Sequence, residues 1–429
     1  MSHHRYNLFE VIGLELEYMI VAAETLEVAP ICDRILADQA GEPTTELTCD
    51  SVGWSNELAL HVIEIKTPEP VADLSGQAGR FDAAIRRIND LCAARAARLM
   101  PTAMHPWMDP ATQTRLWDQA NGPIYQAFDR IFDCRGHGWS NLQSLHINLP
   151  FGDDEQFGRL HAAIRVLLPL LPALAASSPV VDGRVTGLCD NRLAAYAVNC
   201  ARLPLVTGHV VPEAVFSVDQ YHREILQPMY RQIAPLDADG ILQEEWLNAR
   251  GAIARFDRGS IEIRVLDVQE APAADVAIAG LVVGALRLLV DEVYGSYSSQ
   301  RSVRTETLAG VYASAVAEAD RATLADPQLL SLLGAAKAAQ TLRDIWQDLA
   351  EQVALRYPQC LPGELVGPIE TILSAGPLAR RIVGQLGDKP VRAELRGVYA
   401  RLCDALAGGK MYRPKPAGEL PGPVGRFGE

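Results

Sequence analysis

Lysine is scarce in this chain of 429 residues, and no stretch of the chain is basic enough to suggest nucleic-acid binding. Only five lysines occur among 39 basic residues, against 53 acidic residues, so the formal net charge is −14. An acidic surface repels phosphate backbones unless a local basic stripe offsets it, and the sequence contains no such stripe. We therefore expect no nucleic-acid partner.

Paired cysteines and membrane-spanning apolar runs are also missing. The eight cysteines are scattered and form no CxxC pair, which argues against a disulfide framework or a zinc knuckle. The longest apolar runs, 167–176 and 276–290, are broken by proline or arginine and fall short of the roughly 20 residues that a membrane span requires. The first ten residues contain no apolar signal core. These absences predict a cytoplasmic protein with reduced thiols and no membrane partner.

The common sequence motifs of nucleotide-binding loops and of serine hydrolases are absent as well. The sequence has no GxGxxG and no GxSxG elbow, and Gly408-Gly409-Lys410 lacks the upstream glycine of a Walker A motif. A nucleotide would therefore bind through metal ions and arginines on a sheet, and not on a phosphate-binding loop.

Alternation of apolar and polar residues is the main pattern that the chain does contain, and it predicts strands. The strongly alternating segments are 10–20, 56–67, 141–150 and 250–268, the last with a turn at 257–259. Helical spacing predicts one helix over 76–99 and a second, interrupted at its prolines, over 153–178.

Beyond Pro272 the composition changes to Ala, Leu, Glu, Arg and Gln, which predicts helices to about residue 407. We expect one catalytic domain over residues 5–407, with a sheet core over about 9–270 and a helical region over about 271–407. Residues 408–429 are rich in Pro and Gly and are predicted to form a tail. This order of elements predicts an α+β fold with an antiparallel sheet.

Residues able to bind metal ions recur on one face of the predicted strands. Glu15 and Glu17 share a face because alternate residues of a strand point the same way. Taken alone, such a pair also fits a solvated edge strand, and a single strand histidine is usually a structural hydrogen-bonding residue. The same arrangement on separate strands favours one sheet that gathers them on its front. The predicted metal ligands are Glu15, Glu17, Glu64, His146 and Glu262.

This ligand set indicates a hard divalent cation. Carboxylate oxygens select Mg²⁺ or Mn²⁺, which bind phosphates in turn, whereas zinc is disfavoured because one histidine and no cysteine join the group. Lys66, Arg258 and Arg264 would supply positive charge to a phosphoryl group.

The same segments resemble the glutamate–cysteine ligase superfamily, in particular its type 2 carboxylate–amine ligases. GLELEY (13–18) is similar to the family's opening G-x-E-x-E strand, and QSLHINLPF (143–151) resembles its S/G-x-H-x-N strand. SIEIRVLDVQ (260–269) resembles its E-I/L-R-x-x-D-V strand. Further similar segments, in the family's order, are ELALHVIEIKTP (57–68), LLPLLPALAASSPVVDGRVTG (167–187) and NRLAAY (191–196).

The resemblance implies a glutamine-synthetase-like fold, with a curved antiparallel sheet forming a funnel, helices packed behind it and a helical C-terminal region. It implies ATP and Mg²⁺ (or Mn²⁺) at one end of the funnel. It also implies a reaction in which ATP phosphorylates a carboxylate, usually the γ-carboxyl of glutamate. Cysteine or another amine then attacks the acyl phosphate and forms an amide.

Residue roles follow from the same resemblance. Glu57 sits near the incoming amine or a metal and is a candidate base. Arg264 resembles the phosphate-contacting arginine, Arg192 the arginine that holds the α-carboxylate, and Asn148 is assigned to substrate binding. The segments 181–192 and 204–220 are candidate lids over the acyl phosphate.

Some features of the sequence leave alternatives open. ARFDRGS (254–260) departs from the W-D-x-R-P-H-P run of many relatives, which leaves the roles of Arg255 and Arg258 unsettled. A guanidino-kinase-like phosphotransferase and a non-catalytic relative that binds a nucleotide or an amino acid are the competing hypotheses. The partners expected are small-molecule carboxylates and amines. The acceptor amine and the oligomeric state, a homo-oligomer included, stay open.

Overall fold

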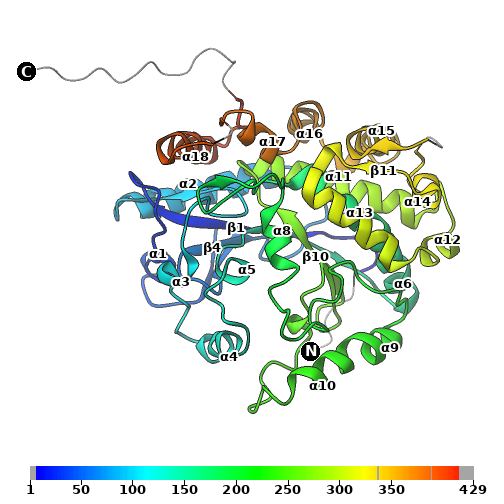
Figure 1. Cartoon of the computed structure of the whole chain (residues 1–429), viewed down its shortest axis with the longest axis horizontal. Coiled ribbons are helices and arrows are strands. Elements are labelled where there is room, and N and C mark those ends of the chain that lie inside the picture. Colours follow the sequence, from blue (N-terminus) through cyan, green and yellow to red (C-terminus); the bar gives the residue numbers. More distant parts are fainter. Residues whose placement is uncertain (1–5, 336–337, 388, 415–429) are drawn as a thin grey trace, which may run out of the picture.

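An antiparallel sheet of eight strands forms the centre of the molecule (Figure 1). The computed structural model describes residues 6–335, 338–387 and 389–414. Seven strands follow the order β2-β3-β4-β1-β6-β10-β9, and β5 pairs with the second half of β1. The strands are β1 (Gly13–Ala22), β2 (Glu46–Cys49), β3 (Val52–Asn56), β4 (Val62–Lys66), β5 (Ala97–Met100), β6 (Ser144–Pro150), β9 (Ala252–Arg255) and β10 (Ser260–Asp267).

Helices and short strand pairs complete the described part of the chain. Those before residue 250 are α1 (Cys32–Ala40), α2 (Gln77–Ala93), α3 (Pro110–Gln113), α4 (Gly122–Phe132), α5 (His137–Ser140), α6 (Asp154–Leu167), η1 (Leu168–Leu170), α7 (Pro172–Ala175), β7 (Val180–Val181), β8 (Arg184–Val185), α8 (Asn191–Tyr196), α9 (Val218–Tyr221), η2 (His222–Leu226), α10 (Gln227–Ile233) and η3 (Glu245–Leu247). Those after it are α11 (Pro272–Val290), α12 (Tyr297–Arg301), α13 (Thr305–Glu318), η4 (Ala319–Arg321), β11 (Thr323–Leu324), α14 (Pro327–Leu332), β12 (Gln340–Thr341), α15 (Leu342–Arg356), η5 (Pro358–Cys360), α16 (Gly363–Ala375), α17 (Leu378–Val383) and α18 (Arg392–Ala407).

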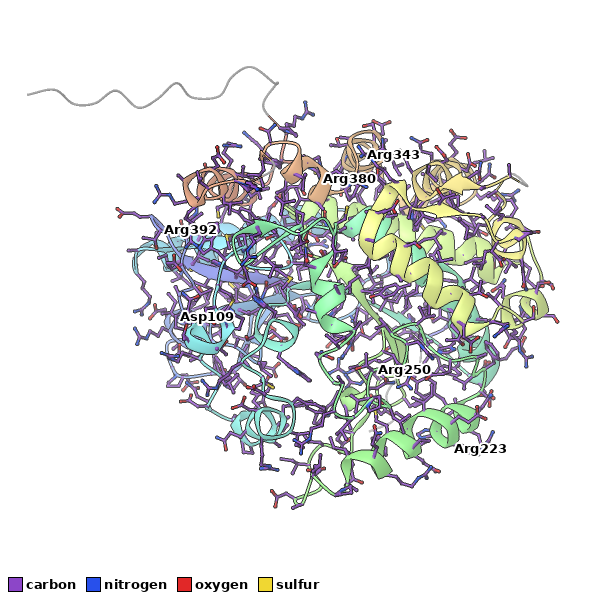
Figure 2. All side chains as sticks on the ribbon, viewed as in Figure 1. Asp109, Arg223, Arg250, Arg343, Arg380 and Arg392 are labelled. Atoms are coloured by element: carbon purple, nitrogen blue, oxygen red, sulfur yellow. The ribbon has the colours of Figure 1, made fainter. Side chains whose placement is uncertain are left out.

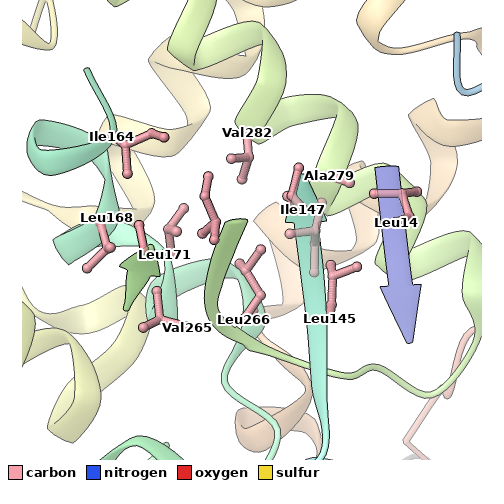
Figure 3. Close-up of a cluster of buried hydrophobic side chains, with 14 of the residues drawn as sticks. Leu14, Leu145, Ile147, Ile164, Leu168, Leu171, Val265, Leu266, Ala279 and Val282 are labelled. Atoms are coloured by element: carbon pink, nitrogen blue, oxygen red, sulfur yellow. The ribbon is translucent and has the colours of Figure 1, made fainter. Parts of the chain in front are cut away.

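The back of the sheet is apolar and is covered by helices. Alternate residues of β1, β6 and β10 are fully buried there against α6, η1 and α11, because a two-residue period turns every second side chain to the same face. Figure 3 shows this packing, with Leu14 and Ile147 of the sheet beside Ala279 and Val282 of α11. The packing leaves the polar residues of the same strands on the opposite, front face.

The register of the strands brings the polar residues of the front face together. Glu15 of β1 lies opposite Lys66 of β4 on one side and His146 of β6 on the other. Glu17 lies opposite Glu64, two residues along the same pair of strands. In the next pair, Glu262 of β10 lies opposite Asn148 of β6. One front face therefore carries acids from three strands, β1, β4 and β10, and an imidazole from a fourth, β6.

The predicted strands and the break in the apolar helix are confirmed, with two corrections. The helix predicted over 76–99 is wrong beyond Ala93, because residues 97–100 instead form β5 and pair with β1, so sheet pairing overrides a helical composition. β3 was not predicted as a separate strand: its five residues are all buried, so no alternation marks it. The helix predicted over 153–178 ends at Leu167, and Pro169 and Pro172 lie in the short turns that follow.

The region beyond residue 271 is mainly helical, as the composition predicts, and packs along the back of the sheet (Figure 1). Among the described residues, α11 alone is long and apolar enough to cross a membrane, and 83% of its most apolar window is buried inside the protein. That degree of burial is typical of a core helix. Beyond residue 271, the only strands in the described part of the chain are the two-residue β11 and β12.

Buried ion pairs tie these helices to one another. Arg343 of α15 and Arg380 of α17 both donate to Asp320, at 2.9 and 3.1 Å, and Figure 2 shows the two arginines near each other at the edge of the molecule. Arg381 pairs with the buried Glu270, and both bond the backbone of Tyr412. The part of the predicted tail up to residue 414 is therefore attached through the buried Tyr412, and 415–429 lie outside the described residues.

Candidate functional site

A polar cavity of about 380 Å³ opens on the front face of the sheet. Figure 1 shows α4 and α5 on this side, away from α11 and the C-terminal helices. Two triplets of acidic and imidazole side chains lie in it, and within each triplet one ligand atom per residue falls within 4.8 Å of the others. The first triplet is Glu15, His146 and Glu262, and the second is Glu17, Glu57 and Glu64.

The first triplet is joined by hydrogen bonds across three strands. His146 Nδ1 lies 3.1 Å from Glu15 Oε2 and 3.6 Å from Glu262 Oε1. Asn148 Nδ2 donates to the other oxygen of Glu15 at 3.0 Å. The three side chains that form the triplet are at most 17% exposed. Their orientation is therefore held by direct partners and by burial.

Opposite charges within this triplet shift the pKa values of its members. Burial alone would raise the pKa of Glu15, but hydrogen bonding to His146 and the positive charges nearby lower it to about 2. Burial alone would lower the pKa of His146, but the Glu15 hydrogen bond and the charges of Glu17 and Glu262 raise it to about 9. The imidazolium thus offsets the mutual repulsion of the surrounding carboxylates.

The second triplet combines two buried carboxylates with a more exposed one. Ser55 Oγ donates to Glu64 at 2.6 Å, and Lys66 Nζ donates to both Ser55 and Glu64 at 2.9 Å. Burial and then the charges of Glu17 and Glu64 raise the pKa of Glu57 well above its usual value. Three carboxylates this close, with one lysine beside them, form a site of strong negative potential.

Ser144 connects the two triplets. Its backbone N–H and its hydroxyl both donate to Glu17, at 2.8 and 3.0 Å. The same hydroxyl lies 2.8 Å from His146 Nε2, so it accepts from the imidazolium while it donates to the carboxylate. The two groups of ligands therefore form one connected network.

Each triplet fits the coordination chemistry of Mg²⁺ or Mn²⁺. Octahedral ligands about 2.1 Å from an ion lie about 3 to 4 Å apart, which agrees with donor atoms within 4.8 Å of one another. Five of the six donors are carboxylates, the ligand type that hard divalent cations prefer. Histidine binds metal as the neutral imidazole, so an ion in the first triplet would take the place of the His146 proton.

Arginines border the acids on the side of β9 and β10. Arg264 Nε donates to Glu262 at 2.6 Å, and Arg255 approaches the other oxygen of Glu262 at 3.7 Å. Arg255 is buried and also bonds Asp257, whereas the side chain of Arg258 is 56% exposed and lies 4.0 Å from Asp257. Arg258 is therefore the most exposed of the three predicted phosphate-binding cations.

Arg192, the predicted carboxylate-binding residue, lines the cavity but is only 2% exposed. Its Nε donates to Asp267 at 2.6 Å, and both terminal nitrogens lie 3.2 Å from the backbone oxygen of Arg264. The guanidinium is therefore held rigidly at the floor of the cavity. The candidate lids 181–192 and 204–220 flank this region in sequence, and their assignment stays a prediction.

A second cavity, of about 560 Å³, adjoins the first and shares Glu15, Lys66 and Arg258 with it. Asn148 lines this second cavity, and its amide oxygen is buried with no hydrogen-bond partner among the described residues. Gly13 faces Asn148 so closely that an added Cβ would lie 3.0 Å from the asparagine Cβ. The glycine of GLELEY thus makes room for the asparagine of SLHINL.

An aromatic surface faces the acids from the other side of the first cavity. It consists of Tyr125 and Phe128 of α4, Trp139 of α5 and Trp246 of η3, and we call these four residues the aromatic wall. Phe128 is central, with ring centroids 5.2 Å from Trp139 and 5.8 Å from Trp246. The cavity therefore has one charged side and one apolar side.

All of the residues predicted as metal ligands, with Glu57, Lys66, Arg192, Arg258 and Arg264, line the first cavity. Sequence reasoning missed Ser55, Ser144 and the aromatic wall. Ser144 has the signal that would reveal it, since it precedes His146 by two residues on the same strand face. Ser55 lies on the unpredicted β3, and the aromatic wall comes from short helices with no strand-like alternation.

Comparison with known proteins decides the family. A model of glutamate–cysteine ligase family 2 matches residues 11–404. The chain belongs to this family. The match confirms the family resemblance that the strand motifs indicated. It extends beyond them through the C-terminal helices and so covers nearly the whole chain.

Individual relatives and solved structures agree with this membership. The chain is 34% identical to an uncharacterized protein of Archaeoglobus fulgidus, over 66% of this chain and 76% of that protein. It is 27% identical to a glutamate–cysteine ligase of Haloferax volcanii, over 72% of this chain and 78% of that one. The crystal structure of a Francisella tularensis glutamate–cysteine ligase in complex with AMP is similar in fold, with a TM-score of 0.60, 12% identity and coverage of 94% and 90%.

The comparisons confirm two of the predictions, the fold and the ligase class. The antiparallel sheet with helices behind it and a helical C-terminal region is the fold of a glutamate–cysteine ligase. The protein is a ligase of this family.

Proposed function

We propose that this ligase uses ATP and Mg²⁺ or Mn²⁺ to join a carboxylate, the γ-carboxyl of glutamate, to an amine. The observation that carries this proposal is the convergence of two ligand triplets from distant strands on one cavity, with arginines bordering them. A reaction between ATP and a carboxylate brings negative groups together, and paired acids that bind divalent ions are suited to that task.

Glu15, His146 and Glu262 would hold one divalent ion, and Glu17 and Glu64 a second, which leaves the adjacent Glu57 free to act as the base. Bound ions of this kind neutralise phosphate charge and align the reacting oxygens. Ser144, Ser55 and Asn148 hold the ligands in place through the hydrogen bonds described above. Burial of the two serines limits reorganisation during the reaction.

The cations of the site have separate tasks in this proposal. Lys66, Arg258 and Arg264 bind the phosphates of the nucleotide, and the first two also border the second cavity, which is large enough for the rest of the nucleotide. Arg192 binds the α-carboxylate of glutamate from the floor of the first cavity, and Asn148 contacts substrate through its unpaired amide oxygen.

Glu57 receives a proton from the attacking amine. It is more exposed than Glu17 and Glu64, and it lies where the acids meet the aromatic side of the cavity, next to Leu58.

Transfer of the γ-phosphoryl group of ATP to the donor carboxylate gives an acyl phosphate and ADP. Attack by the amine then forms the amide and releases phosphate, and a proton passes to Glu57. An acyl phosphate hydrolyses readily, so the segments 181–192 or 204–220 would cover the site.

The test is a phosphate-release assay of the full chain with ATP, Mg²⁺ and paired carboxylates and amines, with products identified by mass spectrometry. The proposal predicts an amide, ADP and phosphate that appear only when both substrates are present. A stable phosphorylated product without an amide would favour the phosphotransferase hypothesis instead. Release of phosphate by no pair, together with no metal-dependent stabilisation by ATP, would favour a non-catalytic relative.

A further inference from the structure

The aromatic wall bears on which amine this ligase accepts. Tyr125, Trp139 and Trp246 are each partly exposed, and all three line the cavity. Contact between apolar surface and water costs free energy. An apolar surface inside a cavity therefore favours an apolar occupant that displaces the water. The wall lines the same cavity as the acids and arginines of the site. We therefore expect part of a substrate to pack against it.

The wall is held in a fixed shape by its own contacts. Trp139 stacks on Phe132, with ring centroids 5.3 Å apart, and its indole N–H donates to the backbone oxygen of Asn199 at 3.2 Å. Phe128 is 9% exposed and contacts the rings on both sides of it. Because these rings are already fixed, a ligand ring can pack against their edges and faces without the entropy cost of ordering them on binding.

The wall begins where the proposed base is placed. Asn56 Nδ2 donates both to the Tyr125 hydroxyl, at 3.2 Å, and to the backbone oxygen of Glu57, at 3.1 Å. Leu58, the next residue along the chain, also lines the cavity. An amine whose nitrogen lies at Glu57 therefore has its substituent against Leu58 and Tyr125.

Among the described residues, the aromatic side of the cavity offers no cation to pair with an acidic substituent. Among the described residues that line the cavity, those from α4, α5 and η3 are all aromatic, and Leu142 beside them is apolar. The cations that line it come from β4, α8 and the β9–β10 hairpin, where Glu64, Asp267, Asp257 and Glu262 already pair with them. A second carboxylate on the acceptor would meet no cation at the wall.

We infer that the acceptor is a primary amine that carries an apolar group of the size of an aromatic ring, bound against the aromatic wall with its nitrogen at Glu57. This inference rests on the proposed function. It separates this ligase from one built for cysteine, whose small side chain would leave most of the wall in contact with water.

The experiment compares 2-phenylethylamine with ethylamine, which share the aminoethyl group and differ by the ring, and with cysteine. With ATP, Mg²⁺ and glutamate, we expect kcat/KM for phenylethylamine to exceed that for each of the others by at least about tenfold. In Trp246→Ala this ratio should fall by about tenfold, and in the matched Trp246→Phe, which keeps a ring, it should stay within about threefold. Equal rates with ethylamine, a preference for cysteine, or a ratio unchanged in Trp246→Ala would overturn the inference.

Hydroxylamine separates this inference from the proposed function, because it traps an acyl phosphate without needing a side-chain pocket. Formation of γ-glutamyl hydroxamate without a preference for phenylethylamine would leave the ligase reaction standing and refute the acceptor. Absence of hydroxamate would refute the proposed donor. Calorimetric titration of the protein with phenylethylamine and ethylamine then still tests the wall, since equal affinities would overturn the inference.

Discussion

Glu15 and His146 face each other across β1 and β6, with His146 Nδ1 3.1 Å from a carboxylate oxygen, although 131 residues separate them in the chain. The pair lies on the side of the sheet opposite to the core, so neither side chain is needed to fill apolar space. Their proximity therefore serves the cavity, and substitutions there should affect activity more than folding.

Glu15→Gln and Glu262→Gln should each lower kcat at least about a thousandfold, because an amide cannot replace a charged metal ligand in a reaction that depends on charge neutralisation. Both variants should still fold, with a lower melting temperature, because the carboxylates also pair with His146 and Arg264. Phosphate release measures the first effect and circular dichroism the second. Glu155→Gln removes an exposed acid that pairs with Arg159, and serves as the charge-matched control. A folded Glu15→Gln with full turnover would contradict the metal assignment.

Mg²⁺ together with a non-hydrolysable ATP analogue should raise the melting temperature of the protein, since a ligand at about 100 times its Kd stabilises the folded state by about 2.7 kcal/mol. EDTA should reverse the rise. In Glu262→Gln the metal-dependent part should be lost. Equal stabilisation of this variant and the unmodified protein would show that the ion binds elsewhere.

Gly53→Val should weaken nucleotide binding. Gly53 lies opposite Lys66, and an added Cβ would approach the lysine Cγ to 3.1 Å, so a larger side chain must displace the lysine from Glu64. We expect KM for ATP to rise about tenfold, as in Lys66→Met, because a charge-assisted contact to phosphate contributes about 1.5 to 3 kcal/mol. Gly79→Val, where nothing lies within 4 Å of the added Cβ, is the control. An unchanged KM in both Gly53→Val and Lys66→Met would remove Lys66 from the nucleotide site.

Arg192→Ala should impair both binding and stability. Arg192 and Asp267 are both buried and paired at 2.6 Å, and loss of one partner of a buried pair costs about 3 to 5 kcal/mol. Urea unfolding measures that loss. At a temperature where the variant is folded, KM for the donor carboxylate should rise more than KM for ATP. A change confined to ATP would reassign Arg192 away from the carboxylate.

His161→Phe should make the protein less sensitive to acid. His161 is fully buried and packs against the rings of Phe157 and Tyr221. Burial lowers its pKa to about 3, and the positive charges of Arg165 and Arg250 act in the same direction. Because the unfolded state takes up the proton near pH 6.5 and the folded state does not until about pH 3, stability is full above 6.5 and falls as the pH drops between these values.

Unfolding by urea at pH 7.5 and pH 5 measures this effect. Phenylalanine removes the titrating group, so the variant should lose about 1.4 kcal/mol less per pH unit below 6.5 than the unmodified protein. Retention of the full pH dependence in His161→Phe would assign it to other groups. The buried His61 and His105, whose pKa values burial lowers to about 4 and about 3, would be the next to substitute.

Strand alternation was enough to predict the charged half of the site, because a period of two reports which side chains share a face. It predicted Glu15, Glu17, Glu64 and Glu262 together, and the structure places them in one cavity. It did not reveal β3, which is buried throughout, or the helical end at Ala93, where pairing with β1 outweighs local propensity. The aromatic wall depends on how α4, α5 and η3 fold back over the sheet, and that arrangement has no local signature.

The strand order has a consequence for how the enzyme is made. β1 begins at Gly13, yet its neighbour β6 ends at Pro150, and β10, which supplies Glu262 and Arg264, ends only at Asp267. During synthesis the first acids thus emerge long before the residues that neutralise and orient them, and the active centre can close only after more than half of the polypeptide has left the ribosome. Pairings over such separations form slowly. Until β6 emerges, one edge of the nascent β1 stays unpaired, and until β10 emerges the same holds for β6, so this ligase should depend on chaperones more than a protein with local contacts would.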